Sequence, residues 1–410
     1  MQAIEEIIAD TPLDGIEMRL MQPEGRANPY PIYRRLREED PVHESPMMGG
    51  WFLSRHEDVS LIRDGRFVQR GPGFEEAFAQ LADADAAAWG KMSSGFMLSM
   101  DPPDHTRLRS LVTKAFTPRA VEALRSRIRE IVDELIGNLR SHGEADLMSE
   151  FAYPLPITVI CELLGVGSDR ERFRPWSAAI GKALDYDMPD VMREASRAAE
   201  EMTEYFMPII DERRRRPGDD LLSALIAAEE DGDRLTRDEV IANLVLLLFA
   251  GHETTVNLIG NGVLALMSNR DQWDHLREDP SLARHGVEEL LRYDSPVQLT
   301  SRNASVDIEL DGKCINAGQH VIFLLGAANH DPAVFSNPDD LDLGRSDVRH
   351  LSFGGGIHFC VGAPLARLEG GIAFESLVAA FPDLHLATQE LVWRQMLVLH
   401  GLQELPVALK

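Results

Sequence analysis

A single cysteine ends a glycine-rich stretch that reads Phe353-Gly354-Gly355-Gly356-Ile357-His358-Phe359-Cys360-Val361-Gly362. The residues that follow, Ala363-Pro364, predict a helix, because proline is favoured in the first helical turn. Cys360 is therefore expected at a helix N-terminus, where free backbone N–H groups and the helix dipole stabilise a thiolate. Gly354 and Gly356 allow a positive φ and a close approach to a flat partner. A thiolate ligand of haem iron fits this pattern, whereas a lone cysteine without it is usually a small buried apolar residue.

Two side chains near residue 105 could bind an anion. His105 and Arg109 follow the helix-start signal Asp101-Pro102-Pro103-Asp104. They lie four residues apart, so a helix places both on one face, and both can donate hydrogen bonds. A solvated helix face is the alternative interpretation of this pair.

A long apolar helix is predicted from the capping box Thr236-Arg237-Asp238-Glu239 to about Met267. Its middle reads Ala250-Gly251-His252-Glu253-Thr254-Thr255. An interior glycine costs about 1 kcal/mol relative to alanine, and an acid and a hydroxyl interrupt an apolar run. One interpretation is a tolerated glycine beside a water-facing carboxylate. The other is a local opening of the helix that exposes a carbonyl and admits dioxygen and water.

The cysteine stretch resembles the haem-binding loop of the cytochrome P-450 family, Phe-Gly-x-Gly-x-His-x-Cys-x-Gly, at all six specified positions. A chance match in a chain of this length has a probability on the order of 10⁻⁵. The resemblance extends over nearly the whole chain, with four motifs in the family's order. It implies a mainly α (α+β) fold, a triangular helical bundle with small β-sheets, in which haem lies between the long central helix and the cysteine loop. One domain over residues 1–410 is expected.

The resemblance also implies roles for single residues. Cys360 is the iron ligand of haem b, and Glu253 and Thr254 relay protons and hydrogen-bond the dioxygen co-substrate. Ala250 and Gly251 border the dioxygen site, whereas His252 occupies a position where the family varies. The remaining haem contacts, which include the propionate partners, are His105, Arg109, Arg302, Phe353, Gly354, His358 and Gly362. A structural ion network is expected from Glu289, Arg292 and Arg345.

The substrate is expected to be a lipophilic small molecule, because the residues at the family's pocket positions are mostly apolar. These residues are Met97, Leu246, Phe249, Ala250, Val297, Leu299 and Thr300. Gln298 and Thr300 could orient a polar group, and Leu399 and Leu402 are further candidates from a C-terminal turn. Residues 71–95, with Phe74 and Phe78, are predicted to form a pocket lid with a short helix.

Electrons from NAD(P)H must arrive one at a time, and the sequence shows no flavin, dinucleotide or iron–sulfur pattern. The resemblance to soluble bacterial members implies ferredoxin and ferredoxin reductase as partners. Arg107, Arg109, Lys114 and Arg367 are predicted to form a basic docking patch on the cysteine side.

Composition limits the classes of partner. Among 410 residues the net charge is −26, which argues against nucleic acid or an anionic membrane surface. Three cysteines predict a reducing compartment without disulfides. The N-terminus does not read as a signal peptide, and no run of about 18 uninterrupted apolar residues is present. We therefore expect a cytoplasmic monomer that spans no membrane.

Strands are predicted at Val42-His43, at Gly50-Trp51-Phe52-Leu53 and within the region Arg302–Val321, together forming one small mixed sheet. Residues 120–230 show helical periodicity, and short strands are predicted around Gly401.

Three alternative functions remain at this point. A peroxide-driven haem-thiolate enzyme would not need the pair Glu253-Thr254. A haem-based gas sensor would need an output element, which the sequence does not show. A structural metal site would need several cysteines or histidines at ligand spacing, and only His358 lies beside Cys360.

Overall fold

The computed structural model describes residues 7–8, 10–46, 48–72, 86–167, 169–185, 188–227, 229–230 and 233–409. The chain forms two compact units. The first unit contains Met1–Pro72, Arg127–Ala152 and Thr254–Lys410, and the second contains Gly73–Ser126 and Tyr153–Glu253. The chain passes between the units four times, so neither unit is one continuous segment. A single domain over residues 1–410 stays a prediction.

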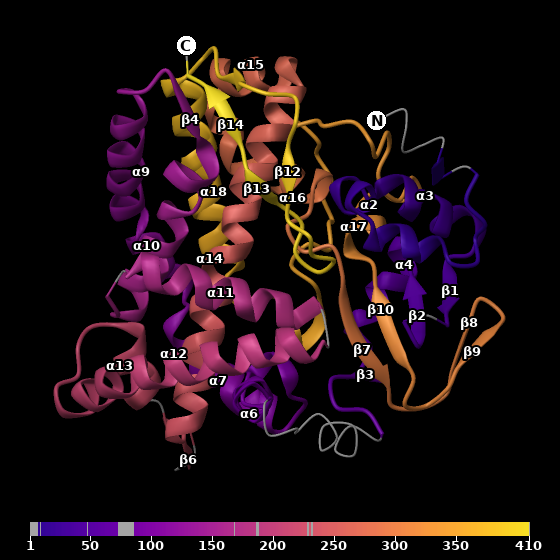
Figure 1. The fold of residues 1–410 in the computed structure, drawn as a ribbon, viewed down its shortest axis with the longest axis horizontal. Coiled ribbons are helices and arrows are strands. Elements are labelled where there is room, and N and C mark those ends of the chain that lie inside the picture. Colours follow the sequence, from indigo (N-terminus) through magenta and orange to yellow (C-terminus); the bar gives the residue numbers. More distant parts are fainter. Residues whose placement is uncertain are drawn as a thin grey trace. The chain divides into compact units, whose positions relative to one another are not determined.

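A five-stranded mixed sheet organises the first unit (Figure 1). Its strands are β1 (Val42–Ser45), β2 (Gly50–Leu53), β10 (His320–Phe323), β7 (Thr300–Ala304) and β3 (Phe67–Val68), in that spatial order. The β2–β10 pair is parallel and the other pairs are antiparallel. The hairpin of β8 (Ile308–Leu310) and β9 (Lys313–Ile315) lies between β7 and β10 in the sequence. The predicted small mixed sheet is confirmed.

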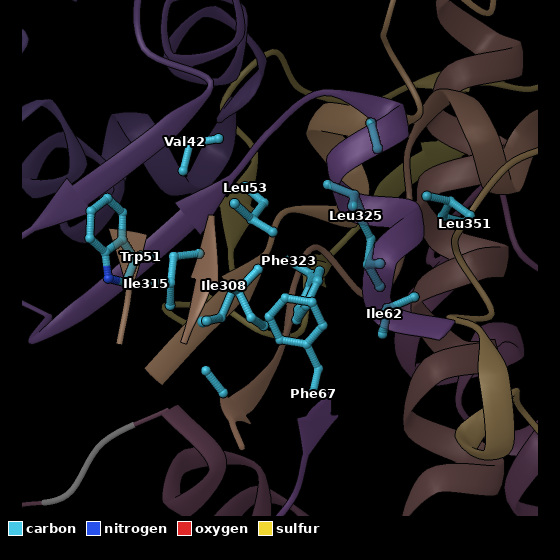
Figure 2. Packing of buried hydrophobic residues seen from close by; sticks show 14 residues of the cluster. Val42, Trp51, Leu53, Ile62, Phe67, Ile308, Ile315, Phe323, Leu325 and Leu351 are labelled. Carbon is cyan, nitrogen blue, oxygen red and sulfur yellow. The ribbon is translucent and has the colours of Figure 1, made fainter. Parts of the chain in front are cut away.

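One face of this sheet carries the apolar cluster that Figure 2 shows. Phe67 and Phe323 meet edge to face, with ring centroids 5.2 Å apart. Burying a side chain of this size stabilises the fold by about 1.5–3 kcal/mol. The cluster reaches Ile62, in the short helix η2 (Ser60–Arg63), and Leu351, which lies two residues before the glycine-rich loop. The packing that holds the sheet therefore also fixes the start of the cysteine loop.

The opposite face of the sheet packs on α3 (Tyr30–Glu39), through Phe52 and Ile322. The other helices of the first unit are α2 (Pro23–Ala27), α4 (His56–Val59), α9 (Arg125–Leu139, which begins in the second unit), α15 (Arg270–Glu278), α16 (Ala283–Tyr293), α17 (Leu325–Ala328) and α18 (Ala363–Ala380). Small sheets are formed by β4 (Glu144–Asp146), β14 (Pro406–Ala408) and β11 (His385–Leu386), and by β12 (Val392–Trp393) with β13 (Leu402–Glu404). The strands predicted around Gly401 are thus confirmed.

The described part of the second unit is mainly helical. Its helices are α6 (Ala87–Ser94), α7 (Asp104–Ala115), α8 (Pro118–Ala123), α10 (Pro154–Leu164), α11 (Arg170–Asp185), α12 (Pro189–Arg215) and α13 (Leu221–Ala227), and a short hairpin pairs β5 (Glu229–Glu230) with β6 (Asp233–Arg234). Of the predicted lid, α6 packs on α12, where the Trp89 N–H donates to the Ser196 hydroxyl over 3.1 Å. Residues 73–85, with Phe74 and Phe78, lie outside the described residues.

The long helix α14 (Arg237–Ser268) agrees with its predicted extent. Its capping box is formed: the Thr236 N–H donates to a Glu239 carboxylate oxygen over 2.7 Å, and the Glu239 N–H donates to the Thr236 hydroxyl over 3.2 Å. By length and composition α14 could cross a membrane, yet 78% of its most apolar window is buried inside the protein. We therefore interpret α14 as a core helix of the protein.

A buried ion network ties α16 to the segment before the cysteine loop. Both Glu289 oxygens accept from Arg292, over 2.7 and 2.8 Å, and one also accepts from Arg345 over 3.0 Å. The remaining Arg292 donors bind the carbonyls of Asn329, Pro338 and Asp340. Because every charged group has partners, the network can be buried without a large desolvation penalty. The structure thus brings together the three residues predicted for this network.

Glu289→Gln should lower the free energy of unfolding by about 3 kcal/mol, because it leaves the buried Arg292 guanidinium and the half-buried Arg345 guanidinium undercompensated. Glu212→Gln, which breaks an exposed pair with Arg215, should cost less than about 1 kcal/mol. Urea unfolding at neutral pH measures both, and equal effects would contradict a structural role for the network.

Candidate functional site

The glycine-rich loop turns sharply before it reaches Cys360. Gly354 and Gly356 have φ of 68° and 63°, which confirms the predicted positive φ at both glycines. A Cβ on Gly355 would lie 2.8 Å from the Arg63 side chain, so close packing of η2 also excludes a larger residue there. The Cys360 N–H donates to the Phe353 carbonyl over 3.0 Å. The loop therefore closes on itself and holds its cysteine at a fixed position.

Cys360 lies just before α18, as predicted from its sequence. The helix starts at Ala363, and the N–H groups of Leu365 and Ala366 donate to the Gly362 carbonyl. A Cβ on Gly362 would lie 3.9 Å from the Cys360 sulfur, in ordinary contact. The Cys360 side chain is half-buried, whereas Cys161 is fully buried and burial raises the pKa of its thiol to about 12. Cys360 thus combines partial access with a position at a helix start, which suits a thiolate ligand.

Asn329 anchors the start of the loop from behind. Its side-chain N–H₂ donates to the hydroxyls of Ser295 and Ser352, over 2.7 and 2.8 Å, and its oxygen accepts from the Leu351 N–H over 2.7 Å. The Ser352 hydroxyl donates to the carbonyl of Leu291 in α16 over 2.7 Å. All of these side chains are buried. This anchor could not be predicted from the sequence, because its partners are far apart along the chain.

Arg367, in α18 after the loop, forms a second set of contacts that holds the loop. Its guanidinium binds the Glu288 carboxylate with two hydrogen bonds, of 2.5 and 3.0 Å, and lies 4.5 Å from the centre of the Phe353 ring. His350 contacts Glu288 over 3.1 Å. Burial raises the pKa of Glu288, but the hydrogen bonds from His350 and Arg367 outweigh burial and lower the pKa to about 2. Glu288 therefore stays ionised and paired.

The predicted basic docking patch is not supported by these contacts. Arg367 is paired with Glu288, and Arg107 is paired with Glu239 at the start of α14. The side chain of Lys114 lies outside the described residues. Pairing neutralises two of the four predicted cations. Beside the cysteine, the exposed side chains are instead apolar: Ile357 is 51% exposed and Phe359 is 42% exposed.

The other predicted site residues of the first unit lie on and before β7. Arg302 is buried, and its guanidinium donates to the Thr300 hydroxyl and to the Ser301 carbonyl. Val297, Leu299 and Thr300 are half-buried. His358 is half-buried within the loop.

Gln298 does not have the predicted role of orienting a polar group of the substrate. Its side chain is buried and donates to the Tyr30 hydroxyl and to the Ser295 carbonyl, over 3.2 and 2.8 Å. A Cβ on Gly326 would collide with its amide. Gln298 therefore belongs to the packing of α3 and α17.

The C-terminal turn with Leu399 is held firmly in the first unit. The His400 N–H donates to the Pro296 carbonyl over 2.9 Å, and the His400 carbonyl accepts from Asn261 in α14 over 3.1 Å. The His400 ring stacks on Trp393 and lies 3.2 Å from the Asp294 carboxylate. Both Leu399 and Leu402 are buried.

In the second unit, α7 carries the predicted anion-binding pair. His105 is buried and Arg109 is half-buried, both on this helix. The start of α14 contacts the short helix η3 (Met97–Ser99): the Asn243 side chain accepts from the Met97 N–H and donates to the Gly95 carbonyl, each over 3.1 Å. Met97, Leu246 and Phe249 are buried apolar residues of this unit. Asn243, a buried amide in an apolar run, is the signal that could have predicted this contact.

The middle of α14 differs in one respect from its prediction. The helix is continuous through Ala250 and Thr254, so the expected local opening is not present in the described structure. Gly251 is explained by packing, since a Cβ there would lie 2.9 Å from the Ile160 side chain of α10. Ala250 is nevertheless exposed, and Gly251 and Thr254 are half-buried, whereas the other residues from 240 to 263 are buried. Ala250 and Thr254 share one face, four residues apart.

Comparison with known proteins gives the same family from three directions. The family model described as cytochrome P450 matches residues 78–396. The chain is 47% identical to cytochrome P450 107B1 of Saccharopolyspora erythraea, over 92% of this chain and 93% of that protein. It is 44% identical to the vitamin D(3) 25-hydroxylase of Pseudonocardia autotrophica, over 93% and 94%. A solved structure of P450BioI with a fatty-acid-ligated acyl carrier protein has a TM-score of 0.89 and 38% identity, covering 95% of this chain and 99% of that chain.

The depressed pKa of Glu288 predicts an acid-dependent loss of stability. Its ordinary pKa is 4.5 and its folded pKa is about 2, so the stabilisation is complete above 4.5 and is lost as the pH falls towards 2. Glu288→Gln should lower the free energy of unfolding by about 2 kcal/mol at pH 7, after an allowance for partial exposure. The difference from the unchanged protein should shrink as the pH falls.

Urea unfolding at several pH values measures this difference. Glu130→Gln, which removes an exposed pair with Arg127, is the matched control and should show almost no pH-dependent difference. A constant difference for Glu288→Gln at all pH values would show that the carboxylate is not held by its charge.

Proposed function

The chain belongs to the cytochrome P450 family and is an oxidoreductase of its monooxygenase class, and we propose that Cys360 is its haem-iron ligand. The observation that carries this proposal is the half-buried thiol on a closed glycine loop at the start of α18. The proposed reaction inserts one oxygen atom of O₂ into a lipophilic small molecule. Electrons would come from NAD(P)H through redox partners.

The residues around the thiol fit haem b. Gly362 leaves the space beside the sulfur without a side chain, since a Cβ there would lie 3.9 Å from it, and a Cβ on Gly354 would meet no atom within 4 Å. When bound, haem would supply the iron at which dioxygen is reduced and cleaved. His105, Arg109, Arg302 and His358 are proposed to bind its propionates, because cationic and N–H donors suit carboxylates. Phe353 would contact the ring from the loop, and Ala250 and Gly251 would border the dioxygen side.

Glu253 and Thr254 are proposed as the pair that delivers protons. Glu253 is buried in α14, and the next residue, Thr254, is half-buried on the same face as Ala250. A carboxyl group beside a hydroxyl can pass a proton through the hydroxyl oxygen to an acceptor that the hydroxyl contacts. Thr254 would hold the dioxygen by hydrogen bonding, and Glu253 would replace the proton that Thr254 passes on.

The electron donor is proposed to be a ferredoxin that is reduced by a ferredoxin reductase. Ile357 and Phe359 stand exposed within three residues of Cys360, and they would form the apolar centre of the contact. Arg107 and Arg367 are already paired, which makes them weaker candidates than their charges alone indicate. We propose a cytoplasmic monomer, because a soluble donor must reach this surface.

The substrate is proposed to be a bulky molecule with few polar groups. The residues at the expected pocket positions, which are Met97, Leu246, Phe249, Val297 and Leu299, all have apolar side chains. Relatives are named as a vitamin D(3) hydroxylase and a 6-deoxyerythronolide B hydroxylase, and one related structure holds testosterone. These molecules share a large apolar body with a few oxygen groups, which agrees with the mostly apolar residue set.

Thr254→Ala should uncouple electron use from product formation, because no hydroxyl would then hold the proton at this position. We expect NAD(P)H consumption to continue while product per NAD(P)H falls by about tenfold or more. The measurement compares product with cofactor consumed in the reconstituted system.

Two control variants separate the hydroxyl from the helix. Thr254→Ser keeps the hydroxyl and should retain most of the coupling, and Thr255→Ala alters a buried neighbour on a different face. Unchanged coupling in Thr254→Ala would remove Thr254 from the proposed mechanism.

A further inference from the structure

His330, two residues after α17, lies between two groups that accept hydrogen bonds. Its Nδ1 lies 2.9 Å from a carboxylate oxygen of Asp339, and its Nε2 lies 2.9 Å from the backbone carbonyl of Tyr293, the last residue of α16. The side chain of His330 is only 6% exposed. Each ring nitrogen must carry a hydrogen to make its bond, and an imidazole with hydrogens on both nitrogens is a cation.

A protonated Asp339 is the alternative, because a neutral carboxyl group could donate to Nδ1 of a neutral ring. Two observations oppose this alternative. The side chain of Asp339 is 51% exposed, and it also binds the Arg34 guanidinium of α3 over 2.7 Å. The hydrogen bond from His330, together with the charges of His330 and Arg34, lowers the pKa of Asp339 to about 2. The carboxylate is therefore ionised at neutral pH, and the proton stays on the ring.

The aromatic rings around His330 also favour a cation. The centres of the Tyr30 and His330 rings are 4.3 Å apart, a distance at which an aromatic face attracts a positive charge. Burial raises the pKa of Tyr30 and of Tyr293, so both phenols stay neutral. The other charged groups that interact within this cluster are Arg34 and Arg37 of α3, Arg292 and Asp294 near the end of α16, and Asp331. Among all these groups, His330 is the one whose ordinary titration lies near neutral pH.

His330 directly follows Asn329, which anchors the start of the cysteine loop. The Asn329 carbonyl accepts from Arg292 over 3.0 Å, and its side chain binds the Ser352 hydroxyl and the Leu351 N–H. The two hydrogen bonds of His330 fix the next residue of the chain to the end of α16 and to the segment that leads towards the loop. A neutral ring could keep only one of them, and the other would become a buried contact between two acceptors, which costs free energy.

We propose that His330 is a positively charged positioning residue at neutral pH, and that its charge holds Asn329, and through it the cysteine loop, in place. When the pH rises and the ring releases one proton to solvent, one of its two hydrogen bonds is lost and the start of the loop loosens. No electrons move in this step. The inference rests on the proposed function, in which the loop presents the Cys360 thiolate to haem iron, and it adds a residue that lies outside the loop.

The first readout is the protonation of the ring. In the purified full-length protein at about pH 8, where an exposed histidine is neutral, ¹⁵N NMR of labelled histidine should show His330 with hydrogens on both nitrogens. The signals are assigned by their loss in His330→Arg, which keeps a positive charge. Asp339→Asn removes the negative partner at a half-exposed position, and His330 should then be neutral at the same pH. A neutral ring in the unchanged protein would overturn the proposal.

The second readout is the pH profile of hydrogen exchange at the Leu351 N–H, which Asn329 binds. Its protection, relative to an unstructured peptide at the same pH, should fall by about tenfold in the unchanged protein as the ring loses its proton, because hydrogen bonds of charged groups are the stronger ones. In His330→Arg the protection should stay level, because a guanidinium keeps its charge. In His330→Gln it should be about tenfold lower at every pH.

His385→Gln, at an exposed histidine in β11, is the matched control and should follow the unchanged protein. A merely structural role of His330 would give each variant a pH profile parallel to that of the unchanged protein. Parallel profiles for the unchanged protein and His330→Arg would therefore reject His330 as a charged positioning residue.

A third readout connects the loop to haem and separates the two proposals. In the haem-supplied protein, reduced under carbon monoxide, the share of thiolate-bound carbonyl complex should fall at alkaline pH in the unchanged protein and persist in His330→Arg. Equal pH dependence in both proteins would contradict the link between His330 and the loop. Absence of this complex at every pH in both proteins would contradict the proposed function instead, and the NMR and exchange results do not depend on it.

Discussion

In the first unit one half-buried thiol is held at the start of a helix, and α16 contacts the segments on both sides of its loop. Four neighbouring positions of α16 act on the segments around the loop. Glu288 binds Arg367 behind the loop, Glu289 and Arg292 bind the segment before it, and the Leu291 carbonyl accepts from Ser352 at its start. The Glu-x-x-Arg pattern is therefore one part of a larger anchor. Buried ion pairs add little stability by themselves, but this pair holds the segment before the loop in place.

The second physical constraint concerns polar groups inside an apolar helix. His252, Glu253 and Asn243 are buried in α14, and each must find a partner in the interior. Asn243 finds backbone groups near η3, and His252 finds a carbonyl of its own helix. Glu253 lies beside His252, with 3.4 Å between a carboxylate oxygen and the second ring nitrogen.

Much of this arrangement follows from local sequence. The cysteine loop, the capping box of α14 and the mixed sheet could be predicted because each depends on residues that are adjacent or regularly spaced. Contacts between distant segments could not. Asn329 and Arg367 look ordinary in the sequence, and their roles appear only when Ser352 and Glu288 are brought beside them. The packing of Gln298 and Gly251 could not be predicted for the same reason: Tyr30 and Ile160, which they contact, are 268 and 91 residues away.

The most direct test of the account is the absorption spectrum of the haem-supplied protein after reduction under carbon monoxide. If Cys360 is the ligand, the unchanged protein should show the strongly red-shifted Soret band of a thiolate-bound carbonyl complex, and Cys360→Ala should lose it. Cys161→Ser and Cys314→Ser should keep it, because the first thiol is buried and protonated and the second lies on the β9 hairpin. A protein that takes up no haem, or a red-shifted band that survives in Cys360→Ala, would contradict the central claim.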